Sequence, residues 1–181
     1  VSGLVINGFN GSGIQVQSND NTITGNFLGT NVAGNAGVSL TSGFGIGIEG
    51  SFRNAIGGTT PASRNVIGGN SDGINLNTSS QNTLVIQGNF IGVGANGTTA
   101  VGNRLHGVVL RGNGGLGVQN NLIGGTVAGA GNTIANNGAA GVAVFGDVAS
   151  TRQNSGNAFL GNSIYNNGRN NAYFMNYSYD A

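Results

Sequence analysis

Few side chains in this 181-residue sequence can carry acid–base chemistry. Lysine and cysteine are absent, and the charged residues and histidine consist of six arginines together with Asp20, Glu49, Asp72, His106, Asp147 and Asp180. Asp72 and His106 each stand directly before a glycine that opens the same short motif, Gly-apolar-x-apolar. If successive copies of this motif lie side by side, the carboxylate of Asp72 can orient the imidazole of His106 as a general base.

The Asp72–His106 pair also has a purely structural interpretation, which we favour. An ion pair at the corner of a repeat offsets an exposed charge and contributes little to stability when it is solvated. No motif in the sequence supplies a serine nucleophile to accompany the pair. We therefore assign no catalytic residue, keep Asp72 and His106 as the candidate pair, and favour a chain without enzymatic activity.

Carboxylate spacing favours the same conclusion. Glycoside hydrolysis needs two carboxylates roughly 5–9.5 Å apart. Glu49 and Asp72 belong to neighbouring motifs, but Glu49 follows its motif and Asp72 precedes its own, so about four residues of extended strand separate them. We expect these two carboxylates to lie beyond the required range.

A second position of interest directly follows each motif. It is occupied in successive motifs by Gln17, Glu49, Asn77, Arg111 and Phe145. A ladder of polar contacts is the favoured interpretation of this column, and sugar binding by Glu49 and Arg111 is the alternative.

The aromatic tail, residues 165–181, is distinct from the rest of the chain. A stack of repeats must cover its last apolar layer, so we favour a C-terminal cap or a joint to a further module for this tail. The alternative is a platform on which a sugar stacks, with Tyr173 and Tyr177 as candidate binding residues.

No metal ion or cofactor is predicted. One histidine cannot build a zinc site, and the absence of cysteine excludes thiolate ligands. The calcium-binding repeat Gly-Gly-x-Gly-x-Asp is also absent. Two matches to Gly-x-Gly-x-x-Gly, at 45–50 and 112–117, are expected by chance in a sequence with 37 glycines, and neither opens a helix.

The composition narrows the range of partners. Only 6% of the residues are charged and the formal net charge is +1, so we expect no basic face for a nucleic acid. Apolar runs are only a few residues long, so we expect no membrane insertion. Disorder is not expected either, because it requires low hydrophobicity together with high net charge.

The repeats indicate the fold. The motif Gly-apolar-x-apolar begins at Gly13, Gly45, Gly73, Gly107 and Gly141. Segments of the form Asn-x-apolar lie between its copies, and apolar residues alternate with small or polar ones at the period of a strand. A meander of hairpins would not restore one motif at the same phase after several different segments. The sequence therefore predicts an all-β fold, a right-handed parallel β-helix (solenoid) of about six coils.

Equal positions of successive motifs should then form columns. One inward column is predicted to contain Ile14, Ile46, Ile74, Val108 and Val142, and a second Val16, Ile48, Leu76, Leu110 and Val144. The motif glycines should form a corner column, where a left-handed or crowded backbone excludes Cβ. Asparagines at the coil corners should stack into amide ladders that make up the polar surface.

The whole chain, 1–181, is predicted to be one β-helix domain. It begins without a signal peptide or an initiator methionine, so we expect a segment of a longer repeat protein. A strand-like run, Leu-Val-Ile at 4–6, lies at its start with little before it. An uncovered strand edge favours end-to-end association, so filament formation is expected.

Three segments carry a resemblance to a known family. They are Gly-Asn-Phe-Leu-Gly-Thr at 25–30, Ile-Gly-Gly-Thr-Thr at 56–60 and Asn-Val-Ile-Gly-Gly-Asn at 65–70. They resemble the right-handed parallel β-helix repeat proteins, which share the fold of the pectate lyases, and in particular the repeat of large secreted bacterial surface proteins. The resemblance implies a secreted or cell-surface location in a bacterium.

The function we expect is a non-catalytic structural or adhesive module of a secreted or cell-surface protein. Its partners would be other copies of itself, neighbouring repeat modules, or a polysaccharide. The alternative is a polysaccharide-active enzyme, a lyase, hydrolase or tailspike-like depolymerase, whose groove is walled by the long loops 29–43 and 92–103. Ice binding requires flat arrays of threonine, and the threonines here are too irregular.

Overall fold

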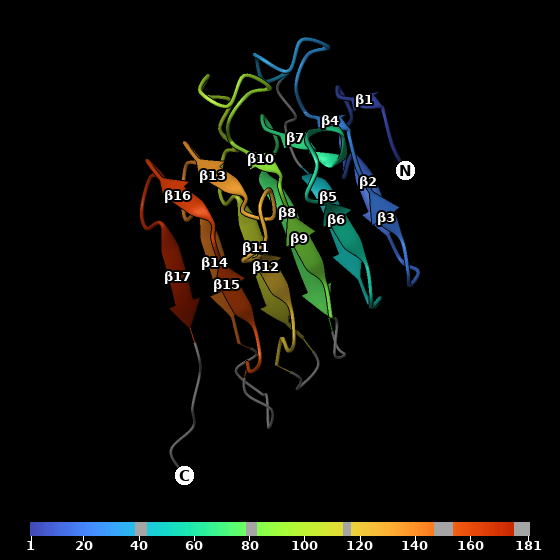
Figure 1. Cartoon of the computed structure of the whole chain (residues 1–181), viewed down its shortest axis with the longest axis vertical. Helices are drawn as coiled ribbons and strands as arrows, with labels where there is room; N and C mark the ends of the chain where they lie inside the picture. Colours follow the sequence, from blue (N-terminus) through green and yellow to red (C-terminus); the bar gives the residue numbers. More distant parts are fainter. Residues whose placement is uncertain (39–42, 79–82, 114–116, 147–153, 176–181) are drawn as a thin grey trace.

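The computed structural model describes residues 1–38, 43–78, 83–113, 117–146 and 154–175. Its strands are short and form three sheets, and the chain returns to the same sheet at every third strand (Figure 1). Every pairing between these strands is parallel, so the predicted all-β parallel β-solenoid is confirmed. The one helix of the described residues is a single 3₁₀ turn, Pro61–Ser63.

The three sheets contain six, six and five strands. The first sheet consists of β1 (Val5–Ile6), β4 (Phe27–Leu28), β7 (Val66–Ile67), β10 (Phe90–Ile91), β13 (Thr133–Ala135) and β16 (Ser163–Tyr165). The second consists of β2 (Ile14–Val16), β5 (Phe44–Glu49), β8 (Asp72–Thr78), β11 (Val108–Gly112), β14 (Val142–Phe145) and β17 (Ala172–Met175). The third consists of β3 (Thr22–Ile23), β6 (Ala55–Gly57), β9 (Val85–Gln87), β12 (Leu122–Gly124) and β15 (Ala158–Leu160).

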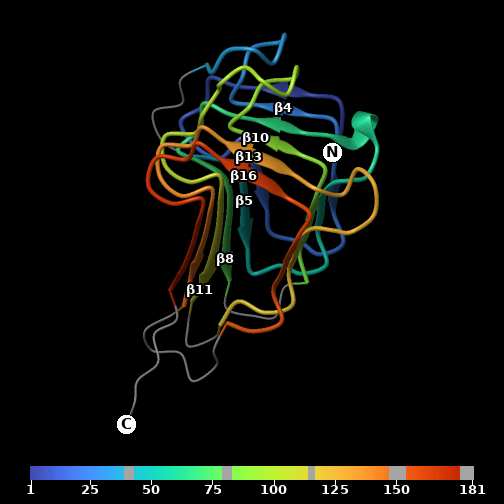
Figure 2. The ribbon, with the colours of Figure 1, turned by 60° about the vertical axis from the view of Figure 1, so that its left-hand side comes forward.

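The first and second sheets meet at a sharp corner. Figure 2 shows β4, β10, β13 and β16 stacked across the upper part of the molecule, while β5, β8 and β11 run downward from it. Four coils, those that begin with β4, β7, β10 and β13, are paired on both sides in these two sheets. The predicted number of about six coils also includes the two end coils, each of which has a neighbour on one side.

The core is built from the predicted columns. In the second sheet Ile14, Ile46, Ile74, Val108 and Val142 are aligned in register, as are Val16, Ile48, Leu76, Leu110 and Val144. The first and third sheets contribute Ile and Leu columns of their own, and all three face a single core. Stacking of identical apolar positions therefore supplies the burial that no single coil could provide.

The motif glycines do form a column, and crowding is the reason. A Cβ built on Gly73 would lie 2.5 Å from the carbonyl oxygen of Gly107, and one on Gly107 would lie 2.6 Å from that of Gly141. None of the five motif glycines has a positive φ. Of the two explanations that the sequence left open, close approach of the next coil is therefore the correct one.

Asparagine ladders run along the axis, as predicted, but they are buried rather than on the surface. In the longest ladder the side-chain amide of each residue donates to Oδ1 of the next, at 2.8–3.1 Å, through Asn26, Asn65, Asn89, Asn132 and Asn162. The same Oδ1 atoms accept a backbone N–H from the preceding coil. A second ladder joins Asn70, Asn103, Asn137 and Asn167.

The ladders satisfy backbone groups where the chain turns between sheets. A buried N–H without an acceptor is costly, and an amide side chain offers both an acceptor and a donor. Asn65 and Asn89 are completely buried. The prediction that asparagine ladders form the polar surface is therefore wrong, because these amides serve the interior of the coil corners.

One corner carries an exposed ion pair. Asp20 and Arg53 occupy equivalent corners of two coils, both with a left-handed backbone, at φ 61° and 55°. The guanidinium of Arg53 donates to both carboxylate oxygens of Asp20 at 2.7 Å. These hydrogen bonds lower the pKa of Asp20 below its ordinary value and raise the pKa of Arg53.

The lowered pKa of Asp20 predicts that the stability difference between the native chain and a variant without this carboxylate depends on pH. A carboxylate whose folded-state pKa is depressed contributes stability above its unfolded pKa and loses it as the pH falls through the folded pKa. The native chain should therefore exceed Asp20→Asn in free energy of unfolding at neutral pH, and the difference should vanish in acid. Urea unfolding of both proteins across this range checks the prediction, and a difference that grows toward acid would contradict it.

Candidate functional site

The outer face of the second sheet carries three parallel rows of side chains along the axis. A buried middle row, formed by Gly47, Asn75, Val109 and Ala143, lies between two rows of larger side chains. One of these is the corner row that precedes the motif glycines, Phe44, Asp72, His106 and Ala140. The other is the row that follows each motif, Glu49, Asn77, Arg111 and Phe145.

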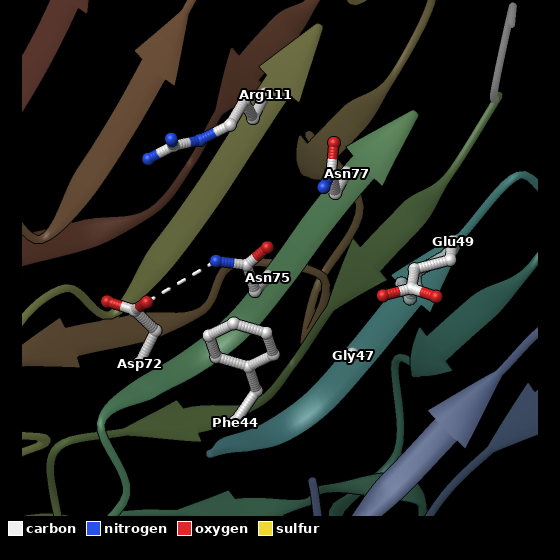
Figure 3. A pocket seen from close by; sticks show the side chains of 8 residues that line it. Phe44, Gly47, Glu49, Asp72, Asn75, Asn77 and Arg111 are labelled. Atoms are coloured by element: carbon white, nitrogen blue, oxygen red, sulfur yellow. Dashed lines mark hydrogen bonds between the residues drawn. The ribbon is translucent and has the colours of Figure 1, made fainter. Parts of the chain in front are cut away.

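The first cavity on this face, of about 240 Å³, lies over β5 and β8. Glycine at position 47 leaves space in the middle row, and Phe44, Glu49, Asp72, Asn75, Asn77 and Arg111 surround it (Figure 3). The amide of Gln15 lies against Gly47 from the neighbouring strand, since a Cβ there would be 2.5 Å from Gln15 Oε1. The amide of Gln15 therefore occupies the space directly over Gly47, and the cavity lies beside it, toward β8.

Glu49 and Arg111, the two candidate binding residues of the motifs, line this cavity together. They are two strands apart, with Asn77 in register between them, as the sequence predicted. Glu49 accepts a hydrogen bond from Gln17 at 3.3 Å, so part of the predicted polar ladder is present. The guanidinium of Arg111 lies 4.9 Å above the ring of Phe145, which fixes its position by a cation–π contact.

Asn77 has an unused acceptor. Its Oδ1 is buried and has no hydrogen-bond donor among the described residues. Buried polar atoms are almost always paired in proteins, so an unpaired oxygen on a residue that lines the cavity singles out Asn77 as a candidate site residue. The sequence placed Asn77 in the column that directly follows each motif. Nothing in the sequence indicated that its side-chain carbonyl would lack a hydrogen-bond donor.

Asp72 and His106 are brought together as predicted. Nδ1 of His106 lies 2.9 Å from Oδ1 of Asp72, and the backbone N–H of His106 donates to the same oxygen at 2.9 Å. Oδ2 of Asp72 accepts from the side-chain amide of Asn75 at 3.3 Å. Asp72 is 6% exposed, so the pair is not the solvated ion pair that the structural interpretation assumed.

The contact with Asp72 determines the tautomer of His106. An ionised carboxylate only accepts hydrogen bonds, so Nδ1 of the imidazole must carry the proton that it shares. In a neutral imidazole Nε2 is then left as an acceptor for a ligand or for water. The ring is held in place by an edge-on contact with Phe145, with centroids 6.0 Å apart. The arrangement can orient an imidazole for hydrogen bonding or for general base chemistry.

Glu49 and Asp72 share the first cavity but lie at its opposite ends. Asp72 is in register with Phe44, and Glu49 lies five positions further along β5. At the rise of an extended strand this separates their Cα atoms by about 16 Å. The sequence anticipated this wide offset, but it did not anticipate that the two acidic residues would line one cavity.

A second cavity, of about 480 Å³, lies further along the same face. Its walls are mostly apolar and come from the segments before β11, β14 and β17 as well as from β14 and β17 themselves. The lining residues are Leu105, His106, Gly138, Ala139, Ala140, Phe145, Arg169, Asn170 and Tyr173. His106 therefore belongs to the second cavity, while its partner Asp72 lines the first.

The aromatic tail is divided by the structure. Tyr173, on β17, packs against Phe145 with ring centroids 6.0 Å apart and lines the second cavity. Tyr165 lies on β16 in the first sheet and is exposed. Tyr177 lies outside the described residues. Of the two candidate tyrosines, Tyr173 is thus placed at a cavity, beside residues Ala139, Ala140 and Arg169 that sequence reasoning did not single out.

The described parts of the two long loops do not line these cavities. The described parts of loops 29–43 and 92–103 pack on each other, and the N–H of Ala95 donates to the carbonyl of Gly34 at 2.8 Å. Neither the first nor the second cavity is lined by them.

The described part of the chain has neither a metal-binding cluster nor a membrane-spanning helix. It contains no group of three or more His, Cys, Asp or Glu side chains that could hold a metal ion. None of its helices combines the length and hydropathy needed to cross a membrane. Comparison of the chain with protein-family models, with curated proteins and with solved structures finds no match.

Proposed function

We propose that this chain is a non-catalytic structural and adhesive module of a secreted or cell-surface protein, and that it contacts glycans through the outer face of its second sheet. The resemblance of its repeats to those of large secreted bacterial surface proteins supports the location. The arrangement of amides, an arginine, carboxylates and aromatic rings on one face supports the ligand, because sugars present many hydroxyl groups and an apolar ring face.

One observation carries the proposal. Glu49, Asn77 and Arg111 line the first cavity together, and Asn77 lies in register between the other two. A sugar hydroxyl can accept from Arg111, and a second hydroxyl can donate to Glu49. Asn77, whose Oδ1 has no donor among the described residues, stands between these two contacts.

A glycan array followed by calorimetry tests the proposal. The native chain should bind a subset of glycans, and Asn77→Leu, which keeps the size of the side chain and removes its amide, should weaken binding at least about tenfold. Thr59→Ala, on an exposed turn that lines neither cavity, is the matched control and should bind as the native chain does. Equal affinity of the native chain and Asn77→Leu would refute the proposed site.

A polysaccharide-cleaving activity is the second candidate, and the Asp72–His106 contact of 2.9 Å favours it. The same glycans, incubated with the chain, should release new reducing ends if this alternative holds. Asp72→Asn should then abolish the release, because the imidazole would lose the carboxylate that orients it. Binding without release supports the non-catalytic module.

The end of the solenoid is the proposed surface for copies of the chain or for neighbouring repeat modules. Leu4, Val5 and Phe9 are exposed there, and β1 is paired on one side only. An unpaired strand edge with apolar side chains is a template for a further parallel strand.

A further inference from the structure

We infer that the second cavity binds the N-acyl group of an acetylated amino sugar, an inference that rests on the proposed glycan-binding function and names its ligand class. The two cavities are joined by the Asp72–His106 pair, since Asp72 lines the first and His106 the second. A glycan chain that lies along this face meets both. The polar first cavity suits hydroxyl groups, and the second differs from it in chemistry.

The walls of the second cavity suit a methyl group and a sugar ring. Ala139 and Ala140 are 8% and 4% exposed, so they offer a small apolar surface at the base of the cavity. Phe145 and Tyr173 stand beside them as a pair of rings in contact. Small apolar residues beside aromatic rings accept the methyl of an acetyl group and the C–H face of a pyranose.

The polar residues supply the two hydrogen bonds that a secondary amide needs. Nδ1 of His106 is committed to Asp72, so Nε2 of the neutral imidazole is an acceptor for an amide N–H. Arg169 is exposed at the same cavity and makes no ion pair with a carboxylate of the described residues, so its guanidinium can donate to the acyl carbonyl. One donor, one acceptor and an apolar base match the group CH₃–CO–NH.

The competing ligand is an acidic sugar, whose carboxylate would pair with Arg169. Such a ligand uses the guanidinium but leaves Nε2 of His106 and the apolar base without a role. The acetylated amino sugar engages all three features, and the acidic sugar is an outcome that the test distinguishes.

The test compares four trisaccharides by calorimetry at neutral pH: the trimers of N-acetylglucosamine, glucosamine, glucose (β-1,4-linked) and galacturonic acid. The N-acetylglucosamine trimer should bind the native chain at least about tenfold more tightly than each of the others, because only it carries the acyl group. His106→Phe keeps a ring against Phe145 and removes the acceptor, and should abolish this preference. Arg169→Ala is a second variant, and it should weaken the binding of the same trimer. Because Arg169 is exposed, this test remains valid even if His106→Phe fails to fold.

The outcomes separate this inference from the proposed function. Equal binding of the acetylated and glucose trimers would overturn the inference, while binding that Asn77→Leu still weakens would leave the proposed function standing. Preference for the galacturonic acid trimer, lost in Arg169→Ala, would also overturn it in favour of an acidic ligand. Absence of binding by every glycan of the array would remove the proposed function and the inference with it.

Discussion

Replacement of Asn89 by alanine is expected to lower the free energy of unfolding by about 3–5 kcal/mol. Oδ1 of Asn89 accepts the backbone N–H and the side-chain amide of Asn65, and its own amide donates to Asn132 and to the carbonyls of Ile56 and Gln87. All of these groups are shielded from water near a fully buried side chain. The alanine variant leaves them without partners and leaves a cavity as well.

Urea unfolding of the Asn89 variants checks this expectation. Asn35→Ala, which removes an exposed loop asparagine, is the matched control and should cost less than about 1 kcal/mol. Asn89→Asp keeps the shape and the acceptor but turns a buried carboxyl oxygen toward the carbonyls of Ile56 and Gln87, so it should also be much less stable than the control. If Asn89→Ala were no less stable than Asn35→Ala, the ladders would not support the fold.

Gly107→Ala is the second change with a large expected effect, a loss of about 3 kcal/mol in the free energy of unfolding. The added Cβ would lie 2.6 Å from the carbonyl oxygen of Gly141 and 2.7 Å from a methyl of Ile134. Neither group can move away, because one is backbone of the next coil and the other belongs to the core. Relief requires the coils to separate, which weakens the parallel pairing on both sides of β11.

Gly11→Ala provides the control for this substitution. A Cβ on Gly11 meets no atom within 4 Å, and the residue has no positive φ. The same chemical change should therefore leave the stability of the chain unaltered or slightly increase it, because the unfolded chain becomes less flexible. Thermal and urea unfolding measure both variants. Equal losses of stability for Gly107→Ala and Gly11→Ala would show that crowding does not require a glycine at position 107.

The columns could be predicted from the sequence because a solenoid repeats its environment. Ile74, Val108 and Val142 occur at one phase of one motif, and stacking then follows from the phase alone. The contact between Asp72 and His106 followed from the same argument, since both precede the motif glycine. Residues at equal positions of adjacent coils become neighbours whatever the length of the loops between them.

Positions where the repeat is broken could not be predicted in this way. The segment 82–84, Asn-Thr-Leu, has the form of an Asn-x-apolar unit, which would place Leu84 at an inward strand position. The register instead aligns Val85 with Ala55, so Leu84 replaces a ladder asparagine opposite Asn54. Leu84 is buried, and its N–H donates to Oδ1 of Asn121, which lies in the next coil.

The two cavities could not be predicted from the sequence for a related reason. The first is lined in part by Gly47, and a glycine in a sequence with 37 of them carries little information. The second depends on the loops before β14 and β17, which supply Ala139 and Arg169 from outside the strand motifs. Periodicity identifies what coils have in common, whereas these cavities arise where one coil differs from the next.

The asparagine ladders also give the rod a direction. In every ladder the side-chain amide donates to the residue of the following coil, from Asn26 toward Asn162 and from Asn70 toward Asn167. The links between ladder asparagines thus all run the same way along the axis, while the second N–H of each amide donates to a backbone carbonyl of the preceding coil. Opposite faces of any coil are chemically unlike, so another coil can be added only with the same orientation. Assemblies that extend this rod must therefore be polar, with every chain in the same orientation along the axis.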